Sequence, residues 1–212
     1  MTKYSHSCVR FEDGDRTMVI DPGVFSEAAV ALEGTNAVLI THEHADHLDL
    51  PVLLAAAERD PELRVWAPKP VADLLSDLGD RVTVAESGQS FEAAGFRIRT
   101  FGGLHALIHP LVAPPVANVC YLVNDAVYHP GDSFTVPTAE VAVLLVPIHA
   151  PWSKIAEVID FTIAVRAARA FQIHDAFLNE TGRGMVENFL GRIGAPYGTT
   201  FAHLAPTDQI AV

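Results

Sequence analysis

Short apolar segments separated by turn residues run through the first two thirds of the chain. Residues 8–12 and 17–20 are joined by Asp-Gly-Asp at 13–15, a combination typical of a hairpin turn. Residues 37–41 form a β-rich apolar run, which predicts a buried strand. Asn-Asp at 124–125 marks a second hairpin. Further strands are predicted in the segments 64–67, 82–85, 96–101, 119–123 and 127–129.

Helices are predicted between several of these strands. Residues 47–58 have a helical pattern in which Pro51 is tolerated only in the first turn. Residues 153–170 form an amphipathic pattern, and Ser153 is a suitable N-cap for it. The remaining predicted elements are helices at 70–78 and 184–194, a buried strand at 141–148 and a strand at 171–174.

The order of these elements indicates the fold class. Hairpins come early and strand–helix units come later, and no linker, repeat or low-complexity stretch divides the chain. This order predicts a single α/β domain over residues 1–212. Two sheets, each covered by helices, would fit it.

Composition and charge narrow the functional classes. Half of the residues are hydrophobic, and the formal net charge is −12. A surface of that sign repels nucleic acid and anionic lipid, so we expect neither as a partner. A small-molecule substrate is expected instead, even an anionic one, because bound divalent cations would invert the local charge. The sequence leaves the oligomeric state open.

The cysteines and the chain start indicate the compartment. Cys8 and Cys120 lie in apolar strand-like runs and form no CxxC pair, so buried free thiols are expected. The first residues lack the apolar core of a signal peptide, and no apolar stretch reaches the length of a membrane span. A cytoplasmic protein is therefore predicted.

The strongest motif is Thr-His-Glu-His-Ala-Asp-His at residues 41–47, which follows the predicted buried strand. Residues two apart in an extended segment point the same way, so His42 and His44 can bind one cation together. Asp46 and His47, at the start of the following helix, project toward a second cation. Imidazole nitrogen and carboxylate oxygen suit zinc, iron or manganese.

Two metals need more ligands than this motif supplies. His105 follows a predicted strand through Gly102-Gly103, and Asp132 follows another in His-Pro-Gly-Asp-Ser. His174 ends the strand at 171–174. Each is a polar residue where a strand opens into a loop, the usual place for sites in α/β proteins.

Together these motifs resemble the metallo-β-lactamase superfamily, over residues 8–174. Within it the chain is most similar to bacterial hydrolases related to the L-ascorbate-6-phosphate lactonase and N-acyl-phosphatidylethanolamine phospholipase D branches. The resemblance implies an αββα sandwich of two mixed sheets flanked by helices. It also implies two divalent metal ions, zinc in the first place and manganese or iron as alternatives.

The resemblance further implies residue roles. The first metal would be held by His42, His44 and His105. The second would be held by Asp46, His47 and His174, and Asp132 would bridge both. A metal-bridging hydroxide would be the nucleophile, because bound zinc lowers the pKa of water to about 7. Catalytic roles then fall to Asp132, through the metals, and to Asp46, which would orient the hydroxide and later take up a proton.

Several neighbouring residues keep two interpretations. His109 competes with His105, which is preferred because it follows the Gly-Gly pair directly; His109 is then a substrate contact or a structural histidine. His129 is interpreted as a core or ligand-supporting residue. His149 and Trp152 either contact substrate or stabilise a turn and pack. Asp21 is expected in a turn that supports the metal loops from behind. His6 and His203 are interpreted as surface or structural histidines.

The leading hypothesis is a metal-dependent hydrolase of a small ester, lactone or phosphodiester. The Gly-His-Thr-like motif of family thiolester hydrolases is replaced by Gly-Gly-Leu-His at 102–105, and there is no second domain like that of the RNA-processing nucleases. The alternative is a non-catalytic metal- or ligand-binding protein, a sensor or scaffold on the same fold. The complete ligand set argues against this alternative.

Overall fold

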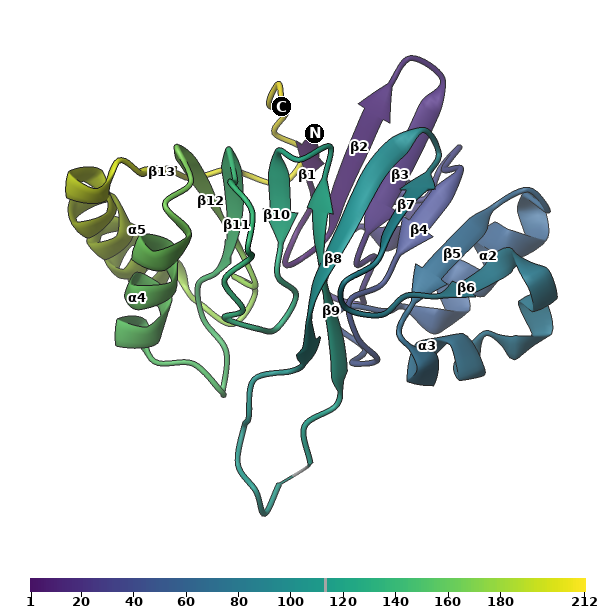
Figure 1. Cartoon of the computed structure of the whole chain (residues 1–212), viewed down its shortest axis with the longest axis horizontal. Helices are drawn as coiled ribbons and strands as arrows, with labels where there is room; N and C mark the ends of the chain where they lie inside the picture. Colours follow the sequence, from purple (N-terminus) through teal and green to yellow (C-terminus); the bar gives the residue numbers. More distant parts are fainter. Residues whose placement is uncertain (113) are drawn as a thin grey trace.

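The computed structural model describes residues 1–112 and 114–212, and its strands form two sheets (Figure 1). The first sheet follows chain order from β1 to β6. Its first three strands pair antiparallel and the rest pair parallel. The strands are β1 (Thr2–Lys3), β2 (Val9–Asp13), β3 (Arg16–Ile20), β4 (Ala37–Leu39), β5 (Arg64–Ala67) and β6 (Val82–Val84).

The second sheet also follows chain order, from β7 to β13. Strands β7 to β10 pair antiparallel, and β10 to β13 pair parallel. Both sheets are therefore mixed, as the family resemblance predicts. The strands are β7 (Ser90–Ala93), β8 (Phe96–Leu104), β9 (Ala117–Val123), β10 (Val127–His129), β11 (Val143–Pro147), β12 (Arg169–Ile173) and β13 (Thr200–Ala202).

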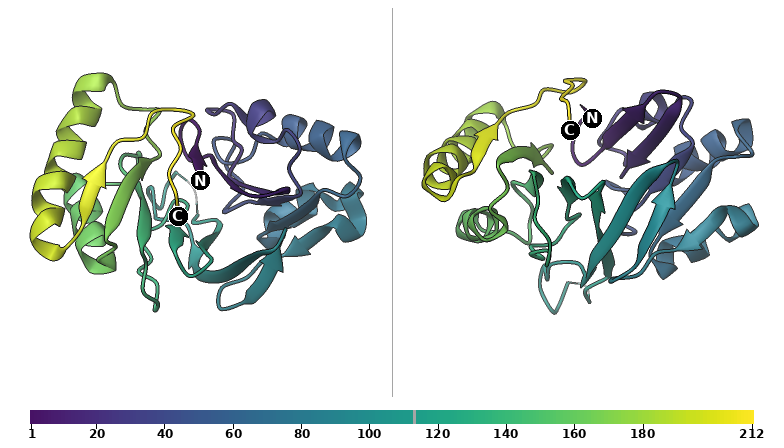
Figure 2. Two further views of the ribbon diagram at one scale, coloured as in Figure 1. Left: turned by 90° about the horizontal axis from the view of Figure 1, so that it is seen from above. Right: turned by 45° about the horizontal axis from the view of Figure 1, so that its top comes forward.

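Helices lie on the outer faces of the two facing sheets, which gives an αββα sandwich (Figures 1 and 2). Those of the first half are α1 (Ala28–Ala31), α2 (Leu50–Arg59), α3 (Lys69–Leu74) and the 3₁₀ helix η1 (Ser76–Arg81). Those of the second half are α4 (Ile155–Val165), α5 (Glu180–Gly194) and the 3₁₀ helix η2 (Ala195–Tyr197). No helix in the described ranges is both long enough and apolar enough to cross a bilayer.

Alternation along the strands explains the three layers of core. Ile20 and Leu39 face the second sheet, whereas Val19 and Val38 face the helices of the first half. In β9, Tyr121 belongs to the core between the sheets, and Cys120 packs toward α4 and α5. Because side chains alternate with period two, strands buried on both faces appear as continuous apolar runs. The predicted sandwich is confirmed, as are the two buried free cysteines.

Several predicted helix boundaries are wrong, and local capping explains them. α2 begins at Leu50 rather than at 47, because the Asp49 carboxylate accepts the Val52 N–H at 3.2 Å and caps the helix there. α4 begins at Ile155 and ends at Val165, with Lys154 and not Ser153 at its N-cap. The Ser153 hydroxyl instead accepts the Ala150 N–H at 2.9 Å in the preceding turn.

The helices at 70–78 and 184–194 also differ from prediction. The first is divided into α3 and η1, and Gly79 lies in the left-handed region at φ 61°. The second begins earlier, at Glu180, because the Asn179 side chain accepts the Gly182 N–H at 2.8 Å. These changes move helix ends but leave the layers unchanged.

Candidate metal centre

The motif at residues 41–47 leaves the end of β4 as a series of turns before α2. His42 and His47 are fully buried, whereas His44 and Asp46 are partly exposed. Asp46 and His47 thus lie in the turns, three or more residues before the helix that was expected to present them. The helix start is wrong for this segment, but the backbone still directs its side chains to one place.

A tight turn at residues 21–23 braces this segment. The Val24 N–H donates to the Ala45 carbonyl at 2.9 Å, and the Asp49 N–H donates to the Pro22 carbonyl at 2.9 Å. Gly23 has no substitute here, because a Cβ atom at this position would lie 1.9 Å from the Asp46 carbonyl oxygen. The close approach of the two backbones therefore holds the metal-binding turns in place.

Four of the predicted ligands form a first group, consisting of His42, His44, His105 and Asp132. The potential ligand atoms of this group all lie within 4.8 Å of one another. His42 Nε2 is 3.1 Å from His44 Nδ1, and His105 Nε2 is 3.2 Å from Asp132 Oδ2. The residues come from the β4 turns and from the loops after β8 and β10, so tertiary structure brings them together.

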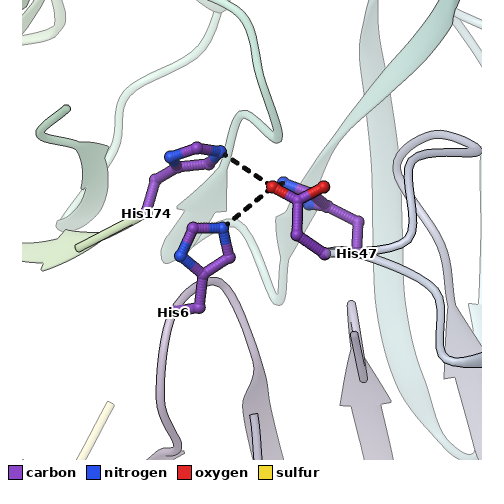
Figure 3. Close-up of side chains that lie close together, drawn as sticks. His6, His47 and His174 are labelled. Atoms are coloured by element: carbon purple, nitrogen blue, oxygen red, sulfur yellow. Dashed lines mark hydrogen bonds and ion pairs between the residues drawn. The ribbon is translucent and has the colours of Figure 1, made fainter. Parts of the chain in front are cut away.

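A second group of ligand atoms, also within 4.8 Å of one another, consists of His6, Asp46, His47 and His174. His6, His47 and His174 converge from three separate segments (Figure 3). Asp132 lies between the two groups, because Oδ1 is 3.0 Å from His47 Nε2 and Oδ2 is 3.0 Å from His174 Nε2. All seven predicted ligands therefore meet around two adjacent positions, with Asp132 placed to serve both.

His6 is the member of the second group that the sequence prediction missed. The sequence predicts a surface or structural histidine at this position. The residue is only 1% exposed, so it is not a surface histidine, and its Nε2 lies 3.1 Å from Asp46 Oδ2. The seven predicted ligands all follow strands, whereas His6 lies in a turn before β2. Only its position three residues before β2 could have pointed to it.

Acceptor groups behind the imidazoles orient them. The Nδ1–H of His47 donates to Asp21 Oδ2 at 2.6 Å, and that of His174 donates to the His149 carbonyl at 2.7 Å. His105 donates in the same way to the Ala106 carbonyl. His42 Nδ1 lies 3.0 Å from the Thr41 hydroxyl, which itself donates to Asp21 at 2.7 Å. Each bond leaves Nε2 with a free lone pair, as a metal ligand requires.

The carboxylates perturb the titration of these rings. Burial opposes charge on His174, but the Asp132 and Asp46 carboxylates together outweigh burial and raise the pKa of His174 to about 9. Burial also opposes charge on His47, yet Asp132 and Asp21 raise the pKa of His47 well above its usual range. Burial and the nearby His47 lower the pKa of His42 well below its usual range. The centre thus attracts positive charge, which a bound cation would supply in place of protons.

The polar atoms of the centre fit a pair of divalent cations. Among the described residues, the buried Nε2 atoms of His47, His105 and His174 and Oδ1 of Asp132 have no hydrogen-bond partner. A buried polar atom without a partner destabilises the folded protein, and one cation at each group would give all four atoms a partner. Nitrogen and carboxylate donors are those preferred by zinc, and they also suit manganese and iron.

The supporting residues occupy different places. Asp21 is fully buried behind His47, and the backbone carbonyl rather than the imidazole of His149 contacts the centre. His129 is buried and donates from Nε2 to the Ser7 carbonyl at 2.8 Å, which makes it a core residue. His109 is exposed, and its Nδ1 accepts the Leu111 N–H at 3.1 Å.

Trp152 has a direct role that its sequence context did not reveal. Its indole Nε1–H donates to Asp132 Oδ2 at 2.9 Å. Its ring centroid lies 5.8 Å from that of His105 and 6.1 Å from that of His174. Trp152 therefore both packs against ligands of the two groups and orients the carboxylate that they share.

Comparisons with known proteins show what this chain is similar to. A family model described as a β-lactamase superfamily domain matches residues 1–174. Protein Rv0786c of Mycobacterium tuberculosis is 36% identical over 99% of this chain and 98% of its own length. The UPF0173 metal-dependent hydrolase MJ1163 of Methanocaldococcus jannaschii is 28% identical over 63% of this chain and 60% of its own.

A solved structure has the same fold. Igni18, a metallo hydrolase from the archaeon Ignicoccus hospitalis, superimposes with a TM-score of 0.74 over 99% of this chain and 96% of its own. The two sequences are only 18% identical, so this likeness concerns the fold alone.

Proposed function

The chain belongs to the β-lactamase superfamily domain family, and on this basis we propose that it is a metal-dependent hydrolase of a small ester, lactone or phosphodiester. The observation that carries the proposal is the pair of ligand groups that share Asp132. Relatives named metal-dependent hydrolases support the reaction type. The strong net negative charge supports a small substrate over nucleic acid.

The proposed ligand sets follow the two groups. His42, His44 and His105 would hold one cation, Asp46, His47 and His174 the other, and Asp132 would contact both. When bound, the cations would supply the Lewis acidity that makes water nucleophilic near neutral pH and polarises the scissile carbonyl or phosphoryl oxygen. The likeness of the ligand chemistry to zinc sites makes zinc the first choice, ahead of manganese and iron.

The side chains of the centre would perform the remaining steps. Asp132 has a side chain only 3% exposed, so it is suited to binding and not to exchanging protons with substrate. The Asp46 side chain is 18% exposed and borders the solvent side of the second group. Asp46 is therefore the carboxylate that would orient the attacking water and hold its proton until the leaving group needs it.

Elemental analysis and a substrate screen test the proposal. Protein purified without added metal is analysed for bound transition metals, then assayed on p-nitrophenyl esters, phosphodiesters and lactones. We expect two equivalents of metal, turnover on one substrate class, and loss of turnover with a chelator that metal restores. His203→Gln is a matched control, because His203 is a histidine outside the centre that pairs with Glu187 at 2.7 Å. Stoichiometric metal without turnover on any class would favour the non-catalytic binding protein.

A further inference from the structure

His6 is held rigidly at the second ligand group. It lies in a turn before β2 with φ 57°, a left-handed conformation that is uncommon for a residue other than glycine. Its ring centroid is 4.1 Å from that of His174, 5.5 Å from that of Phe25 and 5.7 Å from that of Phe177. Its backbone carbonyl also accepts the His174 N–H at 3.2 Å. Such packing indicates a fixed ring orientation.

Distance alone would make His6 a fourth ligand of the second metal, since its Nε2 lies among the potential ligand atoms. The hydrogen bond at the opposite ring nitrogen argues otherwise. His6 Nδ1 faces the backbone N–H of Ala176 at 3.4 Å, so it must accept. A neutral imidazole that accepts at Nδ1 carries its proton on Nε2, where it can donate but cannot bind a cation.

Four other histidines of the chain support a proton on Nε2 of His6. His47, His105 and His174 have a carboxylate or carbonyl acceptor at Nδ1, which leaves the Nε2 lone pair free. His129 resembles His6, because its Nδ1 accepts the Gly131 N–H at 3.2 Å and its Nε2–H donates to a carbonyl. Among these four histidines, the environment of Nδ1 therefore separates the predicted ligands from the donor.

We propose that His6 is a positioning residue, which donates its Nε2–H to Asp46 Oδ2 and so holds that carboxylate in place for the second metal. This rests on the proposed metal centre. The Asp46 side chain is partly exposed and lies in a series of turns, so it needs an external anchor. His6 supplies that anchor from the N-terminal segment, and through its carbonyl it also holds the backbone of His174.

Nuclear magnetic resonance on the unmodified protein tests the tautomer directly. The metals are replaced by ¹¹³Cd in ¹⁵N-labelled protein, and coupling between ¹¹³Cd and each histidine nitrogen is measured. We expect coupling to His42, His44, His47, His105 and His174, and none to His6, whose Nε2 should show a directly bonded proton. Coupling between ¹¹³Cd and His6 Nε2 would overturn the proposal.

Two substitutions test the function of the bond. His6→Gln keeps an N–H donor near the Nε2 position, whereas His6→Phe keeps the ring packing but has no donor. We expect His6→Phe to lower the affinity for the second metal by about 10–100-fold, the usual cost of losing a group that orients a ligand. His6→Gln should stay within a few-fold of the unmodified protein, and the first metal should be retained in both variants. Equal loss of the second metal in both variants would contradict a donor role.

These results are separable from those for the proposed function. A protein that binds two metals but turns over no substrate would refute the hydrolase and leave the role of His6 intact. An active hydrolase with ¹¹³Cd coupling to His6 would refute the donor assignment alone.

Discussion

The first ligand group, His42, His44 and His105 with Asp132, differs from the second in what stands behind its side chains. Its rings are backed by the neutral Thr41 hydroxyl and the Ala106 carbonyl, and His44 is partly exposed. In the second group, His47 Nδ1 contacts the buried Asp21 carboxylate, and His6 Nε2 from the N-terminal segment lies 3.1 Å from Asp46 Oδ2. Each group thus has one partly exposed member, His44 or Asp46, and the second group has more negative charge behind it.

Asp132→Ala should have the largest effect, because it removes a carboxylate that contacts both groups. We expect loss of both metals and of detectable turnover, measured by elemental analysis and by the assay that proves active. Asp73→Ala is the control, since the exposed Asp73 pairs only with Lys69 among the described residues. Retention of two metals in Asp132→Ala would contradict a shared carboxylate.

His44→Ala should affect the first group alone. We expect the affinity for the first metal to fall by more than about 100-fold, beyond the range for changing a group that merely orients a ligand. The second metal should remain, because His44 lies outside that group. Titration against a chelator, together with the two ¹¹³Cd resonances, measures each site separately. Simultaneous loss of both metals would show that the groups are not independent.

Asp21→Asn is the converse experiment on the second group. Asparagine tolerates the left-handed φ of 52° at this position, and its Oδ1 can still accept the Thr41 N–H, but the amide nitrogen in the place of Oδ2 cannot accept from His47 Nδ1. The affinity for the second metal should fall by about 10–100-fold, and the affinity for the first metal by much less. Asp49→Asn, which keeps the acceptor that caps α2, is the control. A larger loss at the first metal would reverse the comparison.

Trp152→Phe should have the smallest effect on metal and should not distinguish the groups. It removes the N–H bond to Asp132 Oδ2 but leaves an aromatic ring beside both groups. We expect the free energy of unfolding to fall by about 1.5–3 kcal/mol, the usual value for a hydrogen bond to a charged group, and metal affinity to change less than tenfold. Trp66→Phe, at a ring that stacks on Phe91, is the matched control in thermal unfolding. Identical unfolding of the two variants would mean that the indole bond contributes nothing.

Much of the fold could be predicted because strand patterning is local. The strand at 127–129 has its predicted bounds, and the predicted strand at 37–41 contains β4 (Ala37–Leu39), since burial on both faces leaves a continuous apolar run along the chain. Helix ends were less predictable. Lys154 and not Ser153 caps α4, because the Ser153 side chain is engaged by the preceding turn. Such competition between caps depends on the backbone path.

By itself, the sequence pattern indicated an α/β domain and seven residues suited to bind metal, because periodic burial and the spacing of strand-end ligands are properties of short segments. The αββα sandwich followed from the family resemblance that those motifs carry. Tertiary structure decided how those residues combine. The packing of the two sheets brings His6 to Asp46 and Trp152 to Asp132, and it places an N–H rather than an acceptor beside His6 Nδ1. Ring tautomers follow from neighbours distant in the chain, so no local pattern could have shown which nitrogen of His6 carries the proton.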